Sequence, residues 1–393
     1  MANGERENLN MISVNITRFE RLIREELEDE NYDPIVGIGV SGIGKTECLP
    51  FICKKLKIGY MELRLVSLND SDLIGLPDYI EHADGSRTST FASNDLLPRA
   101  DRDGEIGLLV LDEFTSASPE LQAACYQLLD SKRSIANYKL PPKWKVVALG
   151  NGPDDGGTYR NNTAAALSRC MCYRISPDIE AWKKWAIPSG VNDSVIAYLS
   201  SNPDMLHVLK DTEYASVFPC PRSWVALSKR LNSREKANGG PLDRDDVLIY
   251  AAGAVGLDNA SEFATFYAFK KQSLNMIDVI NNGEIPNLNN LQEEVISLAI
   301  SSMCKYMAEE ADKEVDDFDY SDGFIKKTAN CMKFIYQLSF RRNELGVQAY
   351  QDLVNSVDNV NLVVMSARDE DDKRFITYFP EYPDMENKFN SIV

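Results

Sequence analysis

The sequence predicts an α/β fold class in which a parallel sheet is followed by helical regions. Three apolar runs, at 34–39, 107–112 and 144–150, have the length of strands and are apolar enough to be buried on both faces. Helical patterns alternate with these runs, as right-handed crossovers between parallel strands require. After Pro177 the pattern changes to helices joined by polar loops. The predicted domains are an α/β domain at 1–176, a helical lid at 177–270 and a helical extension at 271–393.

The other elements of the first domain are predicted from local signals. An amphipathic helix with a charged face covers 12–30. Ser118 suits an N-cap and Pro119 the first helical position, so a helix begins there. The connection at 69–104 is unusually long; such a loop is usually functional or holds its own hairpin, here at 78–92. The remaining predicted elements are a helix at 47–57, a strand at 60–67, a helix at 164–169 and a strand at 170–175.

A phosphate-binding motif follows the first strand. The segment Gly39-Val-Ser-Gly-Ile-Gly-Lys45-Thr46 fits G-x-x-x-x-G-K-[ST], the Walker A loop. Its glycines let backbone N–H groups turn toward phosphate oxygens, Lys45 supplies a charge for the β- and γ-phosphates, and Thr46 can bind Mg²⁺. The helix that follows directs its positive end at the same place. We therefore predict ATP and Mg²⁺ as bound species. The predicted nucleotide contacts are Gly39, Ser41, Gly42, Ile43, Gly44, Lys45, Thr46 and Glu47.

A second motif strengthens this interpretation. The run Gly107-Leu-Leu-Val-Leu-Asp112-Glu113 is a buried strand that ends in two acids, as a Walker B motif does. Asp112 can hold Mg²⁺, usually through water, and Glu113 can take a proton from the attacking water. The alternative, a strand followed by solvated acids, is weakened by the Walker A motif earlier in the chain.

Composition excludes several classes of protein. With 393 residues, 44% of them hydrophobic, the chain is long enough for two or three globular domains. Its formal charge of −18 argues against general nucleic-acid binding, although a local basic patch could still bind. No apolar run approaches the roughly 20 residues that span a bilayer, and the N-terminus does not read as a signal peptide. Eight cysteines without a C-x-x-C pair argue against a structural zinc site and favour reduced thiols in the cytoplasm.

Taken in order, the motifs resemble those of AAA+ ATPases, and most closely the MoxR family, over about 12–270. Asp112-Glu113 stands where the family has its Walker B acids. Residues 271–393 resemble nothing we can name and receive no transferred function. The other matching segments are Leu73-Ile-Gly-Leu-Pro77, Ala148-Leu-Gly-Asn151, Gly156-Gly-Thr-Tyr159, Ala166-Leu-Ser-Arg169 and Pro221-Arg222-Ser-Trp224.

The resemblance implies roles for three further residues. Asn151, at the tip of the sensor 1 strand, would orient the attacking water with Glu113; the alternative is an Asn that stabilises its own Asn-Gly-Pro turn. Arg169 would reach the γ-phosphate held by a neighbouring subunit, and its alternative is a surface salt bridge. Arg222 would contact the nucleotide from the lid or pair with a local acid. The predicted catalytic residues are Lys45, Glu113, Asn151 and Arg169.

The sequence departs from the family pattern in two places. The family often reads "DEINRA" where this chain has Asp112-Glu-Phe-Thr-Ser-Ala117, so the usual Asn and Arg roles cannot be carried over. The segment that ends in Arg169 continues with Cys170 rather than Phe, which leaves Arg160 and Arg133 as alternative arginines acting in trans.

The leading functional hypothesis is an ATP-driven remodelling ring, a hexamer by resemblance, that matures a protein client. MoxR resemblance implies a client that often carries a von Willebrand factor A domain. Tyr79, His82 and Phe91 of the insert would touch that client or anchor their own loop. Two alternatives stay open: a nucleic-acid motor or restriction-like NTPase subunit, and a nucleotide-gated scaffold with little turnover.

Overall fold

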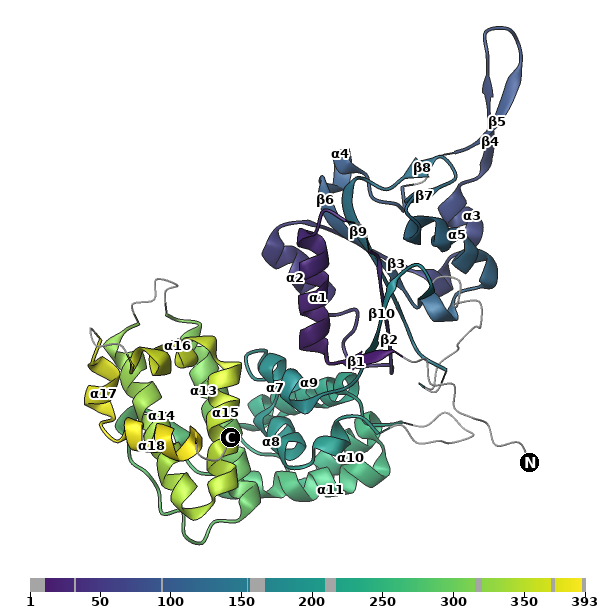
Figure 1. Ribbon diagram of the computed structural model, residues 1–393. Coiled ribbons are helices and arrows are strands. Elements are labelled where there is room, and N and C mark those ends of the chain that lie inside the picture. The colour runs from purple at the N-terminus through teal and green to yellow at the C-terminus, as the bar shows by residue number, and fades with distance from the viewer. Residues whose placement is uncertain are drawn as a thin grey trace. The chain divides into compact units, whose positions relative to one another are not determined.

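A computed structural model describes residues 11–31, 33–92, 95–153, 155, 167–208, 217–314, 320–368 and 372–390. The chain forms two compact units, Met1–Pro177 and Asp178–Val393. The first holds the sheet, and the second is helical in the part of it that the structure describes (Figure 1). The finer division of the second unit at 270/271 stays a prediction.

The central sheet of the first unit has six strands that all run parallel. Its order across the sheet is β1–β10–β2–β9–β6–β3, so the strand with the predicted sensor Asn lies between the two Walker strands. Parallel strands place their carboxyl ends at one edge, and the three motifs therefore meet there. The predicted α/β class with a parallel sheet and a helical C-terminal region is confirmed. The strands are β1 (Ile12–Val14), β2 (Ile35–Gly39), β3 (Gly59–Arg64), β6 (Ile106–Asp112), β9 (Lys143–Gly150) and β10 (Met171–Ile175).

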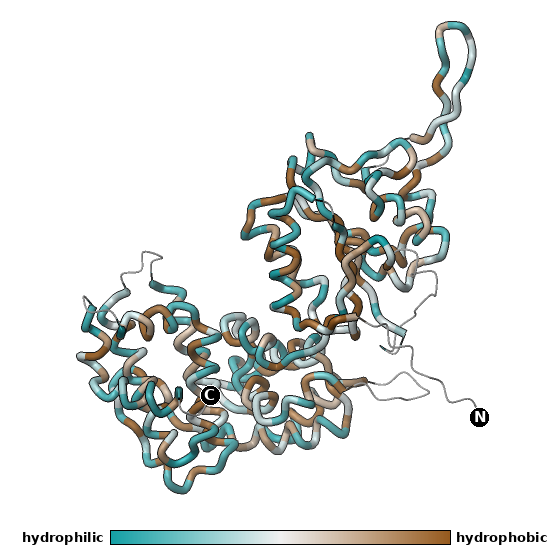
Figure 2. The backbone as a smooth tube through the Cα atoms, in the orientation of Figure 1, coloured by the Kyte–Doolittle hydropathy of each residue, from teal (hydrophilic) through white to brown (hydrophobic). Residues whose placement is uncertain are grey.

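Helices cover both faces of this sheet, and its apolar strands lie between them (Figure 2). On one face, Phe19 of α1 and Ile52 of α2 pack against alternate strand residues such as Val110. On the other face, Leu73 of α3 and Leu121 of α5 pack against the intervening strand residues. This alternation is the period-2 pattern of a sheet that is buried on both faces. The helices are α1 (Ile16–Glu28), α2 (Leu49–Leu56), α3 (Asp70–Ile74), α4 (Ala100–Asp103) and α5 (Pro119–Leu129).

Three element predictions need correction. The first residues of the helix predicted at 12–30 instead form β1, a three-residue edge strand too short and too exposed to show a pattern, and the helix itself is Ile16–Glu28. Asn15 then caps α1 by accepting a hydrogen bond from the Arg18 N–H at 2.9 Å. The helix predicted at 47–57 starts at Leu49, because Pro50 has no N–H and fits only the first turn of a helix. Residues 65–67, predicted as the end of a strand, form a 3₁₀ turn.

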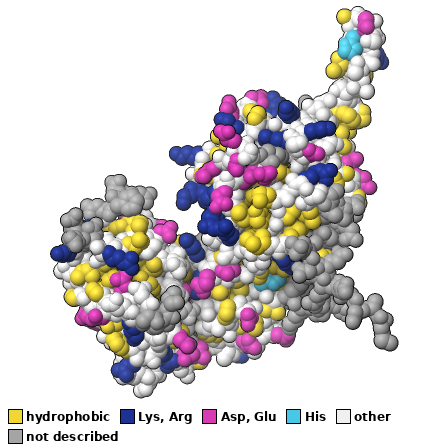
Figure 3. Space-filling view, viewed as in Figure 1, with side chains coloured by type: hydrophobic (Ala, Val, Ile, Leu, Met, Phe, Trp, Pro, Cys, Tyr) yellow, Lys and Arg dark blue, Asp and Glu magenta, His cyan; other side chains and the backbone are white. Residues whose placement is uncertain are grey.

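The predicted hairpin in the insert is confirmed. Strands β4 (Pro77–Glu81) and β5 (Arg87–Phe91) form an antiparallel pair that extends away from the sheet (Figure 1). Asn137 anchors its base by donating from Nδ2 to the Phe91 carbonyl at 3.0 Å. Tyr79 is 53% exposed, and acidic, basic and histidine side chains share the hairpin surface (Figure 3). Asn137 itself lies in the turn of a second small hairpin, formed by β7 (Ser134–Ile135) and β8 (Tyr138–Lys139).

The second unit has one continuous apolar core that runs from Trp182 to Phe389. Helices on both sides of the predicted 270/271 division contribute to it, and α8 packs directly on α13. Among the described residues, no helix combines the length and apolar character needed to cross a membrane. Its helices are α7 (Ile179–Ala186), α8 (Asp193–Ser201), α9 (Pro221–Asn238), α10 (Arg244–Val255), α11 (Leu257–Ala268), α12 (Met276–Asn282), α13 (Glu293–Ala311), α14 (Asp322–Arg341), α15 (Asn343–Ser356), α16 (Asp358–Ser366), α17 (Arg374–Tyr378) and α18 (Tyr382–Asn390).

Candidate functional site

Lys45 lies inside the loop that follows β2. Its ammonium donates to the carbonyls of Gly39 at 2.5 Å and Val40 at 2.8 Å, and to Oδ1 of Asn151 at 3.2 Å. Lys45 as a whole is 8% exposed. These oxygen partners satisfy a buried charge that otherwise would be costly to desolvate. The loop therefore holds its lysine at the point where the sequence predicts phosphate.

The two predicted magnesium ligands are in direct contact. The Thr46 hydroxyl donates to Oδ1 of Asp112 at 3.1 Å, although Thr46 lies in the loop after β2 and Asp112 is the last residue of β6. Hydroxyl and carboxylate oxygens are the ligands that Mg²⁺ prefers, and it commonly keeps several waters. The donor pair therefore fits a Mg²⁺ ion, bound directly or through water.

Glycines shape the backbone around these side chains. Gly42 and Gly44 have positive φ values of 81° and 92°, which side chains other than glycine rarely adopt. A Cβ on Gly44 would meet no atom within 4 Å, so the loop is open there. Gly39 is needed for another reason: a Cβ would lie 2.2 Å from the Ile175 carbonyl of the neighbouring strand β10. The nucleotide contacts of the whole loop, Gly39 and Ser41 to Glu47, remain predictions.

Cys48 borders this loop but is not a nucleophile candidate. Its thiol donates to the Lys45 carbonyl at 3.2 Å, and burial raises the pKa of Cys48 well above its usual range. The thiol is therefore protonated at neutral pH, whereas reactive cysteines are thiolates. All eight cysteines of the chain are free.

Glu113 directly follows Asp112 at the end of β6 and has a left-handed backbone, with φ 56° and ψ 32°. That conformation costs a residue with a side chain about 1–2 kcal/mol. It turns the chain sharply into a 3₁₀ turn, Phe114–Ser116, which is supported by Gln122 of α5 donating to the Phe114 carbonyl at 3.0 Å. Strain of this kind is often found at functional sites, where surrounding structure compensates for it.

Thr115 is a residue of this site that sequence reasoning missed. It is fully buried, and its hydroxyl accepts from the Asn151 N–H at 3.0 Å and donates to the Asn151 carbonyl at 2.9 Å. It stands where the resembled family usually has Asn, so the motif offered no role for it. The two Walker-type segments and the predicted sensor are thus joined by Lys45 and Thr115, which both contact Asn151.

A second missed pair fixes the loop after Asn151. Asp155 is buried, and its carboxylate accepts from the Gly152 N–H at 2.6 Å and from Arg174 of β10 at 2.5 Å. Because charge-assisted hydrogen bonds are the stronger kind, this pair holds the Asn-Gly-Pro turn against the sheet. Asp155 belongs to none of the sequence motifs, so nothing in the sequence pointed to its role.

The predicted arginines lie in different settings. Arg169 is 42% exposed in its side chain, and its Nε lies 3.8 Å from Asp130 Oδ2. Arg133 donates through its guanidinium to the carbonyls of Pro141, Pro142 and Trp144, so it braces its own hairpin. Arg160 lies outside the described residues. Arg222 is exposed in the first turn of α9, in the second unit, and its contact with nucleotide stays a prediction.

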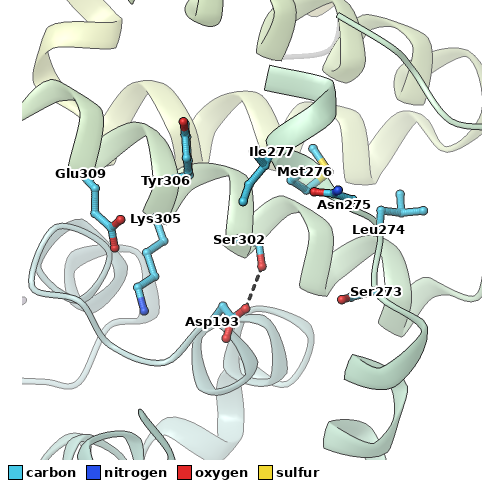
Figure 4. Close-up of a pocket in the computed structure, with 10 residues that line it drawn as sticks. All are labelled: Asp193, Ser273, Leu274, Asn275, Met276, Ile277, Ser302, Lys305, Tyr306 and Glu309. Carbon is cyan, nitrogen blue, oxygen red and sulfur yellow. Dashed lines mark hydrogen bonds between the residues drawn. The ribbon is translucent and has the colours of Figure 1, made fainter. Parts of the chain in front are cut away.

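A pocket of about 460 Å³ in the second unit contains none of the predicted site residues (Figure 4). Asp193 lies in its wall, but its carboxylate already accepts from Ser302 at 2.7 Å and from Lys270 at 2.6 Å. Burial alone would raise the pKa of Asp193; the Lys270 ammonium and the Ser302 hydrogen bond hold it below its usual value instead. This carboxylate therefore serves the packing of α8 against α13.

No family model and no curated protein matches the chain. Among solved structures that do match, a proposed ATPase of Cytophaga hutchinsonii is 16% identical, covers 57% of this chain and 76% of that one, and gives a TM-score of 0.30. A mutant of RuvB from Thermotoga maritima is 13% identical over 88% of this chain and 86% of that one, with a TM-score of 0.35. Closed-state Hsp104 with ATPγS and casein is 16% identical over 56% of this chain and 40% of that one, with a TM-score of 0.30. Values this low assign neither a family nor an activity.

Proposed function

We propose that the chain is an Mg²⁺-dependent ATPase of the AAA+ class and MoxR type, which assembles as a ring, by resemblance a hexamer, and remodels a protein partner. The observation that carries this proposal is the convergence of Lys45, Asp112 and Asn151, which come from three strands, at one edge of the sheet. The order of the sequence motifs supports the AAA+ class, and their resemblance to MoxR proteins supports the type.

Each residue has a distinct task in the proposed reaction. Lys45 leaves its carbonyl partners and neutralises the β- and γ-phosphates. Glu113 accepts a proton from the attacking water as the bond from the γ-phosphorus to the bridging oxygen breaks, and Asn151 orients that water. Thr46 and Asp112 would hold Mg²⁺, which when bound neutralises charge on the phosphate oxygens.

Steady-state ATP hydrolysis by the purified full chain tests this assignment. Glu113→Gln should lower kcat by about 10²-fold or more, because a general base contributes 10²–10⁴-fold, while ATP still binds. Glu120→Gln is the matched control, since Glu120 lies exposed in the first turn of α5. A Glu113→Gln rate equal to that of the unaltered chain would overturn the role of Glu113.

A subunit-mixing experiment tests the ring and the trans arginine. We expect Arg169→Ala and Glu113→Gln each to abolish turnover when alone. Mixed rings would regain part of it, because some subunit boundaries then pair an intact Glu113 with an intact Arg169. We favour Arg169 over Arg133 because Arg133 is already bonded to backbone carbonyls. Absence of any recovery in mixed rings would contradict action in trans.

The protein partner is sought with Glu113→Gln as a trap in saturating MgATP. An affinity pull-down from native cells should enrich one protein, in line with MoxR resemblance one with a von Willebrand factor A domain. Lys45→Ala, which removes the phosphate-binding charge, should lose that protein. Enrichment of nuclease-sensitive nucleic-acid proteins would favour a motor on nucleic acid, and enrichment of nothing would favour a scaffold.

A further inference from the structure

We propose that Thr115 is a positioning residue for the hydrolysis step, acting through Asn151. This inference rests on the ATPase activity proposed above. Thr115 lies two residues after Glu113, on the 3₁₀ turn that directly follows Glu113, and it is completely buried. It is therefore placed to connect the turn that follows the proposed general base with the tip of the neighbouring strand β9.

The hydrogen bonds define what the hydroxyl does. A hydroxyl has one proton to donate, and the Thr115 hydroxyl gives it to the Asn151 carbonyl at 2.9 Å while accepting the Asn151 N–H at 3.0 Å. Asn151 comes immediately after β9, where the strand's pairing with β2 ends at Gly150. One side chain thus replaces the missing strand neighbour and fixes both backbone groups of Asn151.

Gly150 shows that the fit is close. A Cβ at this position would lie 2.4 Å from Thr115 Oγ1 and 2.5 Å from its Cγ2. Gly150 does not have a positive φ, so its backbone conformation does not by itself require glycine. We infer that the absence of a side chain at 150 is what lets Thr115 reach the backbone of the next residue.

Fixing the Asn151 backbone restricts its side chain, whose Oδ1 lies 3.2 Å from the Lys45 ammonium. The same Thr115 contact fixes the distance from Asn151 to the turn of Glu113. Catalysis is sensitive to such placement, because a shift of about 1 Å can cost on the order of 10²-fold in rate. Thr115 would therefore affect turnover without touching the nucleotide.

The first test does not depend on activity. Thr115→Val keeps the shape of the side chain but removes the hydroxyl, and Thr115→Ser keeps the hydroxyl. Hydrogen exchange of a peptide containing Asn151 should be at least about tenfold faster in the Val variant than in the Ser variant, because a buried amide loses its acceptor. Equal exchange in the two variants would overturn the proposed contact.

The second test measures turnover of the full chain. We expect Thr115→Val to lower kcat for ATP by about 10-fold or more, with the KM and the Kd for ATP within about 3-fold, and Thr115→Ser to restore kcat. Thr328→Val is the matched control, since Thr328 is equally buried but lies in α14 of the second unit. An unchanged kcat in Thr115→Val, or an equal loss in Thr115→Ser, overturns the inference alone. If the unaltered chain hydrolyses no ATP, the proposed function is overturned instead.

Discussion

The buried ion pair between Lys183 and Asp352 allows a quantitative prediction about the second unit. Lys183 lies in the last turn of α7 and Asp352 near the end of α15, and the ammonium donates directly to the carboxylate. Their side chains are 2% and 5% exposed. Glu180 is a further partner of Lys183 at 2.8 Å, but it is largely exposed. The pair thus joins the predicted lid to the predicted extension, so the two segments would move together.

Lys183→Met should cost about 3–5 kcal/mol of unfolding free energy at pH 8, because it leaves a buried carboxylate without its cation. Burial already raises the pKa of Asp352 to about 6, despite the opposing attraction of Lys183. When folding raises the pKa of a group, the stability that the group contributes to the protein is lost as the pH rises through the folded-state pKa. The variant should therefore recover part of its loss at pH 5, where Asp352 takes up a proton.

Urea unfolding followed by tryptophan fluorescence measures this effect, since Trp182, Trp185 and Trp224 all lie in the second unit. Lys271→Met is the control: its partner Asp243 lies 2.7 Å away, but both side chains are exposed, so the loss should stay below about 1 kcal/mol.

Replacing both partners, Lys183→Met with Asp352→Leu, should return the free energy to within about 1–2 kcal/mol of the unaltered chain, because no unpaired charge remains. The reasoning fails if Lys183→Met costs no more than Lys271→Met, if its cost is the same at pH 5 and pH 8, or if the two changes simply add.

Three other predictions concern single side chains. Gly150→Ala should lower the free energy of unfolding by about 1–3 kcal/mol, because the added methyl group overpacks against Thr115. Adding Thr115→Ala should recover most of this loss. Thermal unfolding of both variants measures the two changes, and a double variant no more stable than Gly150→Ala would contradict the clash. Glu113→Gly should unfold with a free energy about 1 kcal/mol higher than Glu113→Ala, because glycine accepts the left-handed backbone and neither variant has the carboxylate; a more stable Ala variant would contradict the strain. The unaltered chain should be more stable than Asp193→Asn above pH 4 and should lose that advantage as the pH falls, because Lys270 and Ser302 lower the Asp193 pKa despite burial. Denaturant titrations at several pH values measure the difference in unfolding free energy between the two chains. A difference that stayed constant with pH would refute the prediction.

Much of the site could be predicted because its information is local. Glycines with a following Lys45-Thr46 indicate a phosphate loop, and an apolar run ending in Asp112-Glu113 indicates a strand with acids at its tip. Parallel strands align their carboxyl ends, so the meeting of these motifs at one edge follows from the fold class. The start of α2 could also have been predicted, since Pro50 fits only the first turn of a helix.

Tertiary structure decided the features that depend on contacts between segments far apart in the chain. The sheet order places β9 between β2 and β6, and only this order brings Thr115 to the backbone of Asn151. Asp155 with Arg174, and Lys183 with Asp352, are pairs whose members carry no distinguishing neighbours in sequence. A buried polar group must find a partner wherever the fold provides one. The sequence by itself determined the chemistry at the strand tips, and packing determined which side chains hold those tips in place.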